Sequence, residues 1–434
     1  MLIQRAMLLD GRVLDIRAGR QIDELADHLV PEQGEQVLDA RLGTVIPGLH
    51  DHHVHLYSAA AALASVRVGP RDVGNRDGLA RALATAEAGG DGWVRAVGYH
   101  ESVAGPLDRA VLDEMSPLVP LRVQHRSGVL WILNSAGLAR VGLADHLDGR
   151  LHSADPSWAH ALRRNETGLA ELSQRLTRYG VTGITDATPD LGVGDIVKLT
   201  GAHRHGELRQ RVHYLAPGKR ILHDDALDLG ELTRWVAERH GTGCPVAVHC
   251  VTAAQLVVTV AALQSAGSHP RDRIEHAAVV PDDCVEDLAD LGVTVVTQPN
   301  LVAERGDQYL SDVPAAEHHQ LWRVASLLRA NVAVALSTDM PFGDGDPWAA
   351  MRAAVRRITP SGAVLGRDEC VSAPAAVTMF LGSPDRPARA RTVAPGQPGD
   401  LCVLAEPPAE VLRELDADML AATVIDGDVV FERA

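Results

Sequence analysis

Aromatic side chains, lysine and paired cysteines are all scarce in this chain of 434 residues. Aromatic residues make up 3% of the sequence and hydrophobic residues 46%, so the core has to be built mainly from aliphatic side chains. The five cysteines include no Cys-x-x-Cys pair, which argues against a disulfide framework and against a structural zinc knot. Lysine occurs only as Lys198 and Lys219, so a lysine at a functional position would be notable in this chain.

Long apolar runs and an excess of positive charge are missing as well. No apolar stretch approaches the ~18 residues that a membrane span needs, and the polar residues that soon follow the start do not fit a signal peptide. The formal net charge of −16 argues against a nucleic-acid partner, which would need a basic face. We therefore expect a cytoplasmic protein with a small-molecule substrate, no nucleic-acid partner and no membrane partner. A homo-oligomer stays open.

Strand-like segments with Asp-Gly turns occupy both ends of the chain, and the centre differs from them. The two ends predict one small β domain built from residues 1–46 and 390–434. Between them, short apolar strands alternate with helical stretches, a pattern typical of parallel βα units. We expect an α/β fold with a (β/α)8 TIM-like barrel over 47–389, an insertion around 60–165, and a small β-sandwich domain formed by both termini.

The centre offers nine candidate strands for the eight positions of such a barrel. One of the segments 93–98 and 121–124 is therefore expected to belong to the insertion. Helices are predicted between the strands, for example over 256–266 and over 284–291, where a Pro-Asp-Asp sequence gives a start signal.

A His-rich segment, LHDHHVHL, emerges from a Pro-Gly corner near the start of the predicted barrel. In a β-strand, residues two apart point to the same face, so Asp51, His53 and His55 share one face, and His50 and His52 share the other. Two imidazoles about 7 Å apart along one strand can converge on a metal ion. A His-rich surface strand is the alternative, but four histidines in six residues are costly to bury without a purpose.

Three later apolar runs end in residues of the same type. His249 and His276 end two of them and lie 27 residues apart, about one βα unit, and Asp339 ends the third. Strand ends in a (β/α)8 barrel face one pocket, so these side chains are expected to meet His53 and His55 there. A lone histidine at a strand end is more often structural, but their joint occurrence favours a metal site. Ligands without thiolates suit zinc best, with manganese, iron or nickel as alternatives.

Such a site indicates hydrolysis at a carbonyl-like centre. A divalent ion held by nitrogen and oxygen ligands lowers the pKa of a water molecule towards about 7 and polarises a carbonyl group. A carboxylate beside the ion can take the proton of that water and pass it to the leaving group, and Asp339 is the natural candidate. The substrate classes that fit are amides, imides, formamides and esters.

These motifs resemble the metal-dependent amidohydrolase superfamily over nearly the whole chain. The pattern Pro-Gly-x-x-Asp-x-His-x-His is followed in order by the later two histidines and the late aspartate. The stretches GWVRAVGY, HRSG and TDMPF are similar to the N-substituted formamide deformylase-like branch. The resemblance implies His53 and His55 on one metal, His249 and His276 on that metal or a second one, and Asp339 as ligand and proton shuttle. It thus implies a metal-dependent hydrolase cleaving an amide-type C–N bond, with one or two ions, zinc first among them.

Lys219 raises the question of how many ions are bound. Many members of the superfamily bridge two metals with a carboxylated lysine at the end of the fourth strand, and Lys219 lies at the expected interval before His249. Arg220 is the competing residue for that position, and an arginine cannot serve as such a bridge. A two-metal site with Lys219 and a one-metal site without it both stay open.

Several further residues receive predicted roles. Tyr99, His125 and Trp131 are candidates for holding the substrate. Asp51 suits a supporting role beside the ligands. Glu275 is expected to point to the opposite face of its strand from His276 and to support the exterior of the barrel.

Two alternative functions compete with amide hydrolysis. The first is a metal-dependent deaminase of a heterocyclic amine on the same fold. Related deaminases commonly carry a glutamate three residues after the third histidine, where this chain has Thr252, which counts against it. The second is a catalytically silent barrel that acts as a scaffold. Loss of metal ligands would mark that case, and none of the four histidines or the aspartate is missing.

Overall fold

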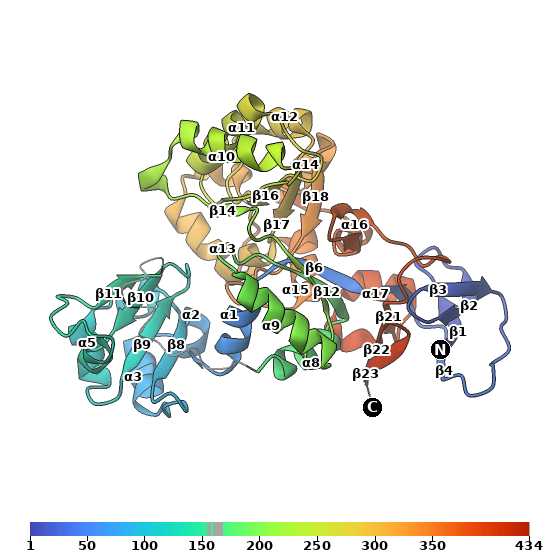
Figure 1. Ribbon diagram of the computed structural model, residues 1–434, viewed down its shortest axis with the longest axis horizontal. Coiled ribbons are helices and arrows are strands. Elements are labelled where there is room, and N and C mark those ends of the chain that lie inside the picture. Colours follow the sequence, from blue (N-terminus) through green and yellow to red (C-terminus); the bar gives the residue numbers. More distant parts are fainter. Residues whose placement is uncertain (154–157, 159–167, 434) are drawn as a thin grey trace. The chain divides into compact units, whose positions relative to one another are not determined.

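The computed structural model describes residues 1–153, 158 and 168–433. The end of the predicted insertion, beyond residue 153 and apart from Trp158, therefore lies outside the described residues. The described chain has a mixed α/β fold (Figure 1). No helix within it combines the length and the apolar character needed to cross a membrane.

The chain divides into two compact units, and the larger one contains residues 1–56 and 169–434. Both chain ends lie in this unit and build two four-stranded sheets (blue and red in Figure 1). The first, in the order β3-β2-β1-β4, consists of β1 (Leu2–Met7), β2 (Val13–Ala18), β3 (Ile22–Ala26) and β4 (Val37–Asp39). The second, in the order β23-β22-β21-β5, consists of β5 (Val45–Pro47), β21 (Leu401–Leu404), β22 (Leu420–Ile425) and β23 (Asp428–Glu432).

Aliphatic residues of both terminal sheets share one buried cluster, which includes Ile3, Ile16, Val45, Val403 and Val424. An Asp-Gly pair with positive φ at both residues makes the tight turn between β22 and β23, as expected of a two-residue hairpin loop. The two ends of the sequence are therefore held together by packing as well as by the antiparallel pairing of β5 with β21.

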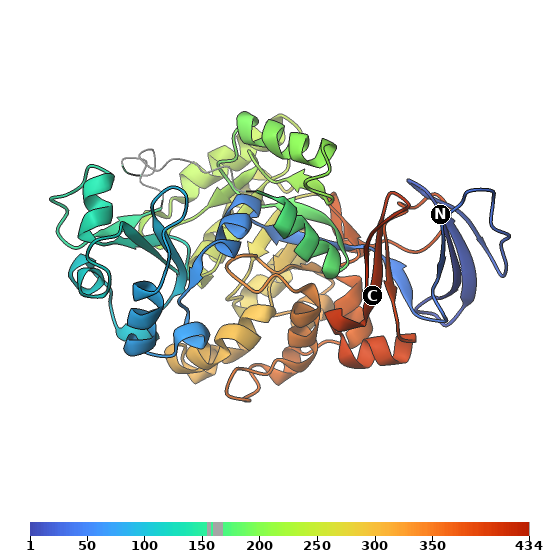
Figure 2. The ribbon, with the colours of Figure 1, turned by 90° about the horizontal axis from the view of Figure 1, so that it is seen from below.

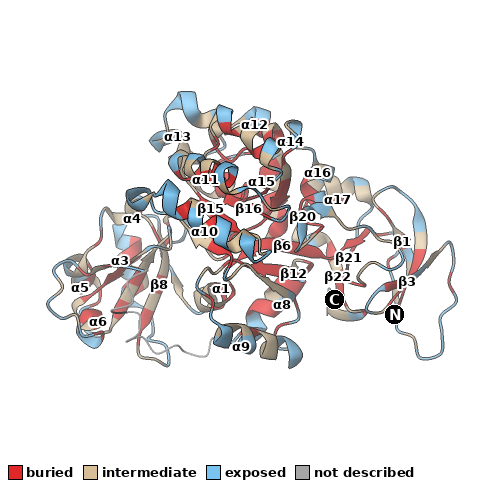
Figure 3. Ribbon diagram, turned by 45° about the horizontal axis from the view of Figure 1, so that its top comes forward, coloured by how far each residue is buried: buried red, intermediate tan, exposed pale blue. Residues whose placement is uncertain are grey.

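Eight parallel strands form the centre of the larger unit, in sheets of three and five. The smaller sheet, in the order β13-β12-β6, contains β6 (Leu49–Val54), β12 (Val181–Asp186) and β13 (Arg211–Tyr214). The larger sheet runs in chain order through β14 (Lys219–Ile221), β15 (Ala247–Cys250), β16 (Arg273–His276), β17 (Thr294–Thr297) and β18 (Ala333–Leu336). Most of these strand residues are buried, as expected for parallel strands covered by helices (red in Figure 3).

The two parallel sheets approach each other beside β6. Among the described residues, no strand ladder joins β6 to β18 or β13 to β14, so a closed barrel is not seen. Two backbone bonds nevertheless link the end of β6 to the segment after β18. The N–H of Asp339 donates to the carbonyl of His53 at 3.0 Å, and the N–H of His55 donates to the carbonyl of Met340 at 2.9 Å. These bonds bring two distant parts of the sequence together at the ends of their strands.

Helices of the larger unit lie on the outer side of the parallel strands, and α10, α11 and α12 run side by side there (Figures 1 and 2). The predicted helix 256–266 begins earlier, at Ala253, because Thr252 caps it and accepts from the N–H of Gln255. The helices with the central strands are α8 (Ala170–Arg178), α9 (Val193–Arg204), α10 (Leu229–Gly241), α11 (Ala253–Ala266), α12 (Asp282–Leu291), α13 (Asn300–Asp312), α14 (Ala325–Arg329) and α15 (Pro347–Arg356). Towards the C-terminus follow α16 (Ala373–Thr378), the hairpin of β19 (Gly382–Ser383) and β20 (Arg386–Ala390), and α17 (Pro408–Glu414).

The second unit, residues 57–168, has a mixed five-stranded sheet of its own in the order β11-β10-β9-β8-β7. Its strands are β7 (Val66–Arg67), β8 (Val94–Tyr99), β9 (Leu121–His125), β10 (Leu130–Leu133) and β11 (Arg150–His152). One core cluster joins this sheet to helices that include α3 and α5. The helices in its described part include α1 (Leu56–Leu63), which starts at the boundary, α2 (Pro70–Val73), α3 (Arg76–Ala84), α4 (Glu101–Ala104), α5 (Arg109–Met115) and α6 (Ser135–Arg140).

The structure corrects the expected choice between 93–98 and 121–124. Both segments are strands of the second unit, as β8 and β9, and pair with each other. The eighth central strand is instead β14, whose three residues are too few to give a hydrophobic pattern in the sequence.

Candidate metal centre

Strand β6 positions the first two predicted ligands. His53 is fully buried inside the strand, and His55 follows directly after its end and is half-buried. Their Nε2 atoms lie 3.6 and 3.5 Å from Oδ1 of Asp339, respectively. The candidate ligand atoms of these three residues all lie within 4.8 Å of one another, so one ion could contact all three after small side-chain shifts.

Two neighbouring strands add the other predicted histidines. His249 comes from β15 and His276 from β16, and their ring centroids are 4.4 Å apart. The ring of His276 also lies 4.7 Å from that of His53. The five residues first singled out in the sequence are therefore brought together at one end of the parallel strands.

Asp339 follows β18 with a φ of 56°, a left-handed conformation that aspartate tolerates better than most residues. Burial alone raises the pKa of its carboxyl group, but His55, His276 and Lys219 outweigh burial and hold the pKa below its ordinary value. Its Oδ1 atom is buried and makes no hydrogen bond within the described part of the chain. A charged carboxylate oxygen of this kind needs a cation or a proton donor next to it.

Lys219, and not Arg220, reaches the cluster. Its Nζ atom is buried and lies 3.1 Å from Nε2 of His53. Burial lowers the pKa of the Lys219 ammonium to about 8. The register explains the choice, because Ile221 pairs with His249, so that Lys219, two residues earlier, lies on the same face of the sheet as His249. Arg220 has the opposite orientation and forms an ion pair with Glu231 outside the cluster.

The expected position of Glu275 on the exterior is wrong. Glu275 is fully buried, and Oε2 accepts a hydrogen bond from Nδ1 of His53 while both carboxylate oxygens accept from the Arg273 guanidinium. In the register of β15 and β16, Glu275 pairs with His249 and thus shares its face. His276 reaches the same side because its φ is 70°, which breaks the alternation of side chains at the strand end.

In two of the candidate ligands, His53 and His276, Nδ1 is hydrogen-bonded to a side-chain oxygen. Glu275 accepts from Nδ1 of His53, and Oε1 of Gln298 lies 2.8 Å from Nδ1 of His276. The amide of Gln298 is oriented in turn by donating to the hydroxyl of Ser337 at 2.8 Å. These contacts leave Nε2 of both rings as the nitrogen that carries the lone pair, and metal-binding histidines are typically held in this way. Gln298 had no sequence signal, because a glutamine after a strand has no distinctive pattern.

Three histidines of the cluster, His53, His249 and His276, are held in the neutral form that binds metals. Burial, together with the nearby charge of Lys219, keeps the pKa of His53 well below its ordinary value. Burial also lowers the pKa of His249 and of His276. Neutral imidazoles are metal ligands, whereas imidazolium ions are not.

Asp51 holds the segment that carries Asp339. Its Oδ1 and Oδ2 atoms accept from the N–H and the hydroxyl of Thr338, at 3.1 and 2.5 Å. Burial raises the pKa of Asp51 to about 7 despite these bonds. On the other side of β6, His50 bonds to the hydroxyl of Thr185 at 2.9 Å, and His52 stacks against His50 with ring centroids 4.6 Å apart.

The three candidate substrate contacts all belong to the second unit. Tyr99 is fully buried in its core, and its hydroxyl donates to the carbonyl of Gly105. Trp131 is buried in a cluster with other tryptophans, where the guanidinium of Arg122 lies 5.5 Å from its ring centroid. His125 lies at the end of β9 with Nε2 3.0 Å from the carboxylate of Glu101. Their role towards a substrate stays a prediction.

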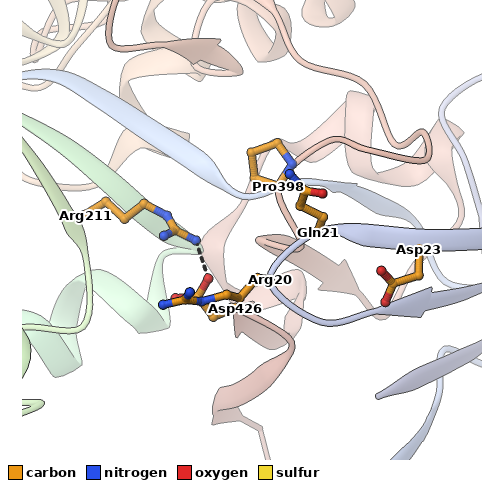
Figure 4. A pocket seen from close by; sticks show the side chains of 6 residues that line it. All are labelled: Arg20, Gln21, Asp23, Arg211, Pro398 and Asp426. Atoms are coloured by element: carbon orange, nitrogen blue, oxygen red, sulfur yellow. Dashed lines mark hydrogen bonds and ion pairs between the residues drawn. The ribbon is translucent and has the colours of Figure 1, made fainter.

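A surface pocket of the larger unit has a different character (Figure 4). Its lining includes Arg20, Gln21 and Asp426 from the terminal strands and their turns, together with Arg211 at the start of β13. Arg211 forms an ion pair with Asp426 at 2.7 Å and a two-pronged pair with the buried Asp400. The charge of Arg211 is thus balanced by two aspartates, and these ion pairs connect the terminal strands to the central ones.

The side-chain cluster at the ends of the central strands fits a divalent ion. It combines imidazoles with one charged carboxylate and has no thiolates, and imidazole and carboxylate are ligands that zinc and similar ions accept. The unbonded buried oxygen of Asp339 lies where such an ion would be contacted.

Known proteins share this architecture. An uncharacterised metal-dependent hydrolase from Pyrococcus horikoshii OT3 superposes with a TM-score of 0.74 at 18% sequence identity, covering 95% of this chain and 98% of that one. N-isopropylammelide isopropylaminohydrolase from Burkholderia multivorans superposes with a TM-score of 0.56 at 16% identity, covering 99% and 98%. In sequence, the N-substituted formamide deformylase of Arthrobacter pascens is 26% identical over 92% of this chain and 90% of its own length.

The fold is shared with proteins that are named as metal-dependent hydrolases. A profile of the amidohydrolase family matches residues 36–431, and the chain belongs to that family. The resemblance drawn from the sequence is therefore confirmed, as is the prediction that the protein is an enzyme.

Proposed function

We propose that the protein hydrolyses an amide-type C–N bond in an N-substituted amide, a formamide or a cyclic amide, with the help of one or two divalent ions, zinc first among them. The observation that carries this proposal is the buried, unbonded carboxylate oxygen of Asp339 facing His53 and His55. The family supports it, as do the names of two similar proteins, a formamide deformylase and an isopropylaminohydrolase.

The proposed ligands are His53, His55, His249, His276 and Asp339, with Lys219 as a further ligand between two ions after carboxylation. Its buried amine, 3.1 Å from Nε2 of His53, supports its inclusion. Bound there, a divalent ion would supply a water molecule of lowered pKa and would polarise the carbonyl group of the substrate.

Asp339 moves the proton in the proposed reaction. Its carboxylate takes a proton from the attacking water, because the surrounding His55, His276 and Lys219 keep it ionised. The new bond joins the water oxygen to the carbonyl carbon, and the C–N bond breaks. Asp339 then returns the proton to the leaving nitrogen, so that the products are a carboxylic acid and an amine. Asp51 keeps the Asp339 segment in place through Thr338.

The remaining architectural predictions are part of the same proposal. The eight parallel strands are proposed to form a (β/α)8 barrel over 47–389, interrupted by the insertion, and the two terminal sheets to form a β-sandwich. The shared core of the terminal sheets and the backbone bonds between β6 and the segment after β18 support this arrangement. A cytoplasmic location and a homo-oligomer stay predictions.

Deamination of a heterocyclic amine is the second candidate, since one similar structure is named as an aminohydrolase. Thr252 stands where related deaminases commonly have a glutamate. In the structure this threonine caps α11 and bonds to Asp224 at 2.9 Å, so it has a structural task. Amide hydrolysis is therefore the preferred function.

The test compares wild-type protein with D339N on a panel of N-substituted formamides, simple amides, cyclic amides and heterocyclic amines. Formate, carboxylate, amine and ammonia are measured, together with metal content. We expect amide substrates to release acid and amine, and D339N to lose activity by about 10²–10⁴-fold while it keeps bound metal. D344N, in the exposed loop a few residues later, is the control and should stay active. Full activity of D339N would rule out its proton transfer, and ammonia release alone would favour the deaminase.

A further inference from the structure

The second unit carries a separate group of metal-binding side chains at the ends of two parallel strands. His100 follows β8 directly, Glu101 begins α4, and His125 is the last residue of β9. Tyr99 pairs with His125 in the β8–β9 register, and the N–H of Arg126 donates to the carbonyl of Tyr99 at 2.8 Å. The pairing keeps the two strand ends level, so that both histidines lie beside the same carboxylate.

The ligand atoms of this group converge on one point. Oε2 of Glu101 lies 3.0 Å from Nε2 of His125 and 4.0 Å from Nε2 of His100. The candidate ligand atoms of all three residues lie within 4.8 Å of one another. Donors around a tetrahedral zinc ion are roughly 3.4 Å apart, given bonds of about 2.0–2.1 Å. Side-chain shifts of about an ångström would therefore complete the geometry.

The same local motif, His-x-Ser, holds both imidazoles. Nδ1 of His100 lies 3.0 Å from the hydroxyl of Ser102, and Nδ1 of His125 lies 2.7 Å from that of Ser127. The backbone N–H of each serine donates to the same Nδ1, at 3.2 Å, so Nδ1 accepts and Nε2 of each neutral ring faces Glu101 with the proton. When Nε2 binds an ion, the ring proton moves to Nδ1, so the bond from the serine N–H is lost and the serine hydroxyl accepts from Nδ1 instead. Metal-binding histidines typically donate their second ring nitrogen to an oxygen, and the serine hydroxyl is the oxygen within reach here.

We propose that His100, Glu101 and His125 form a second metal site, for a divalent transition ion of the zinc class. Two imidazoles and one carboxylate leave a coordination position for water. The side chains are accessible, with 20%, 39% and 17% of their surfaces exposed, respectively. With three ligands and this exposure, the site is weaker than the cluster at the central strands. It joins the ends of β8 and β9, and it uses none of the proposed metal ligands of the catalytic centre.

The experiment measures bound zinc per chain in the full-length protein across a series of free-zinc buffers. Wild type should take up one equivalent more than the catalytic cluster alone, at the higher free-zinc levels. E101Q and H125Q should each lose this weaker equivalent and keep the tighter zinc. H152N, which removes an exposed histidine of the same unit, is the matched control and should bind zinc like wild type.

A variant of the catalytic cluster separates the two proposals. H249N should lose tight zinc and activity but keep the weaker equivalent, because His249 belongs to the larger unit. Cobalt reconstitution gives a second readout, since the visible absorption of the weaker site should be absent in E101Q. If wild type, E101Q and H125Q bind the same amount of zinc at every free concentration, the second site does not exist and the three residues form only a hydrogen-bonded cluster. That result would leave the function of the cluster at the central strands untouched.

Discussion

Replacing Glu275 by glutamine tests the idea that a buried carboxylate holds the first metal ligand. Glu275 is fully buried and accepts from Nδ1 of His53 and from the guanidinium of Arg273. The substitution keeps the size of the side chain and removes its charge. Arg273, which is 4% exposed, would then keep its charge without a carboxylate partner.

Two effects of E275Q follow, with different magnitudes. Breaking a buried ion pair by removing one partner costs about 3–5 kcal/mol of folding stability. We expect the lower end, about 3 kcal/mol, because Arg273 also donates to the carbonyl of His52 at 2.7 Å and the new amide oxygen can still accept a hydrogen bond. The weaker partner for His53 should also lower metal affinity, by about 10–100-fold.

Urea unfolding of the metal-free protein measures the first effect, and zinc uptake from buffered solutions measures the second. E231Q is the control, because its partner Arg220 is 28% exposed and Glu231 is 55% exposed, and such surface pairs contribute only about 0–1 kcal/mol. Metal affinity in E275Q equal to that of wild type would refute the role of Glu275 in holding His53. A loss of stability without a loss of metal affinity would mean that Glu275 serves only as the ion-pair partner of Arg273.

Two further substitutions test other parts of the site and fold. K219A should lower both the bound metal per chain and the activity. R220A, which removes a side chain on the opposite face of β14, is the control and should leave the metal content unchanged. Equal metal content in K219A and wild type would exclude Lys219 as a ligand. Burial raises the pKa of Asp346 to about 6 in the folded protein, above the ordinary 3.8, so folding disfavours the charged form of this carboxyl group. Wild type should therefore lose stability as the pH rises from about 4 to about 6, and D346N, which has no such carboxyl group, should become more stable relative to it. The difference in unfolding free energy between D346N and wild type should change by at most about 3 kcal/mol across this window, and denaturant unfolding that shows no such change would contradict it.

His249, His276 and Asp339 could be predicted because each ends an apolar run. That pattern indicates both a buried strand and a polar side chain where the strand meets the pocket. It can be recognised without knowing the register of the strand. The hairpin turn between β22 and β23 was readable for a similar reason, since Asp-Gly has few uses other than a tight turn. The second unit was harder, because β8 and β9 are apolar parallel strands like those of the centre. Only their pairing partners tell them apart.

The errors at Glu275 and the open choice at Lys219 have one physical origin. The face of a strand residue depends on its register with a neighbour, and a shift by one residue reverses every side chain. The pairing of Ile221 and Glu275 with His249 places Lys219, His249 and Glu275 on one face. His276 joins them only through its left-handed backbone, so alternation counted back from His276 assigned Glu275 to the wrong side. Asp339, three residues after the end of β18, has the same left-handed conformation. Sequence alternation therefore finds the proposed ligands of this cluster but not the residues that hold them.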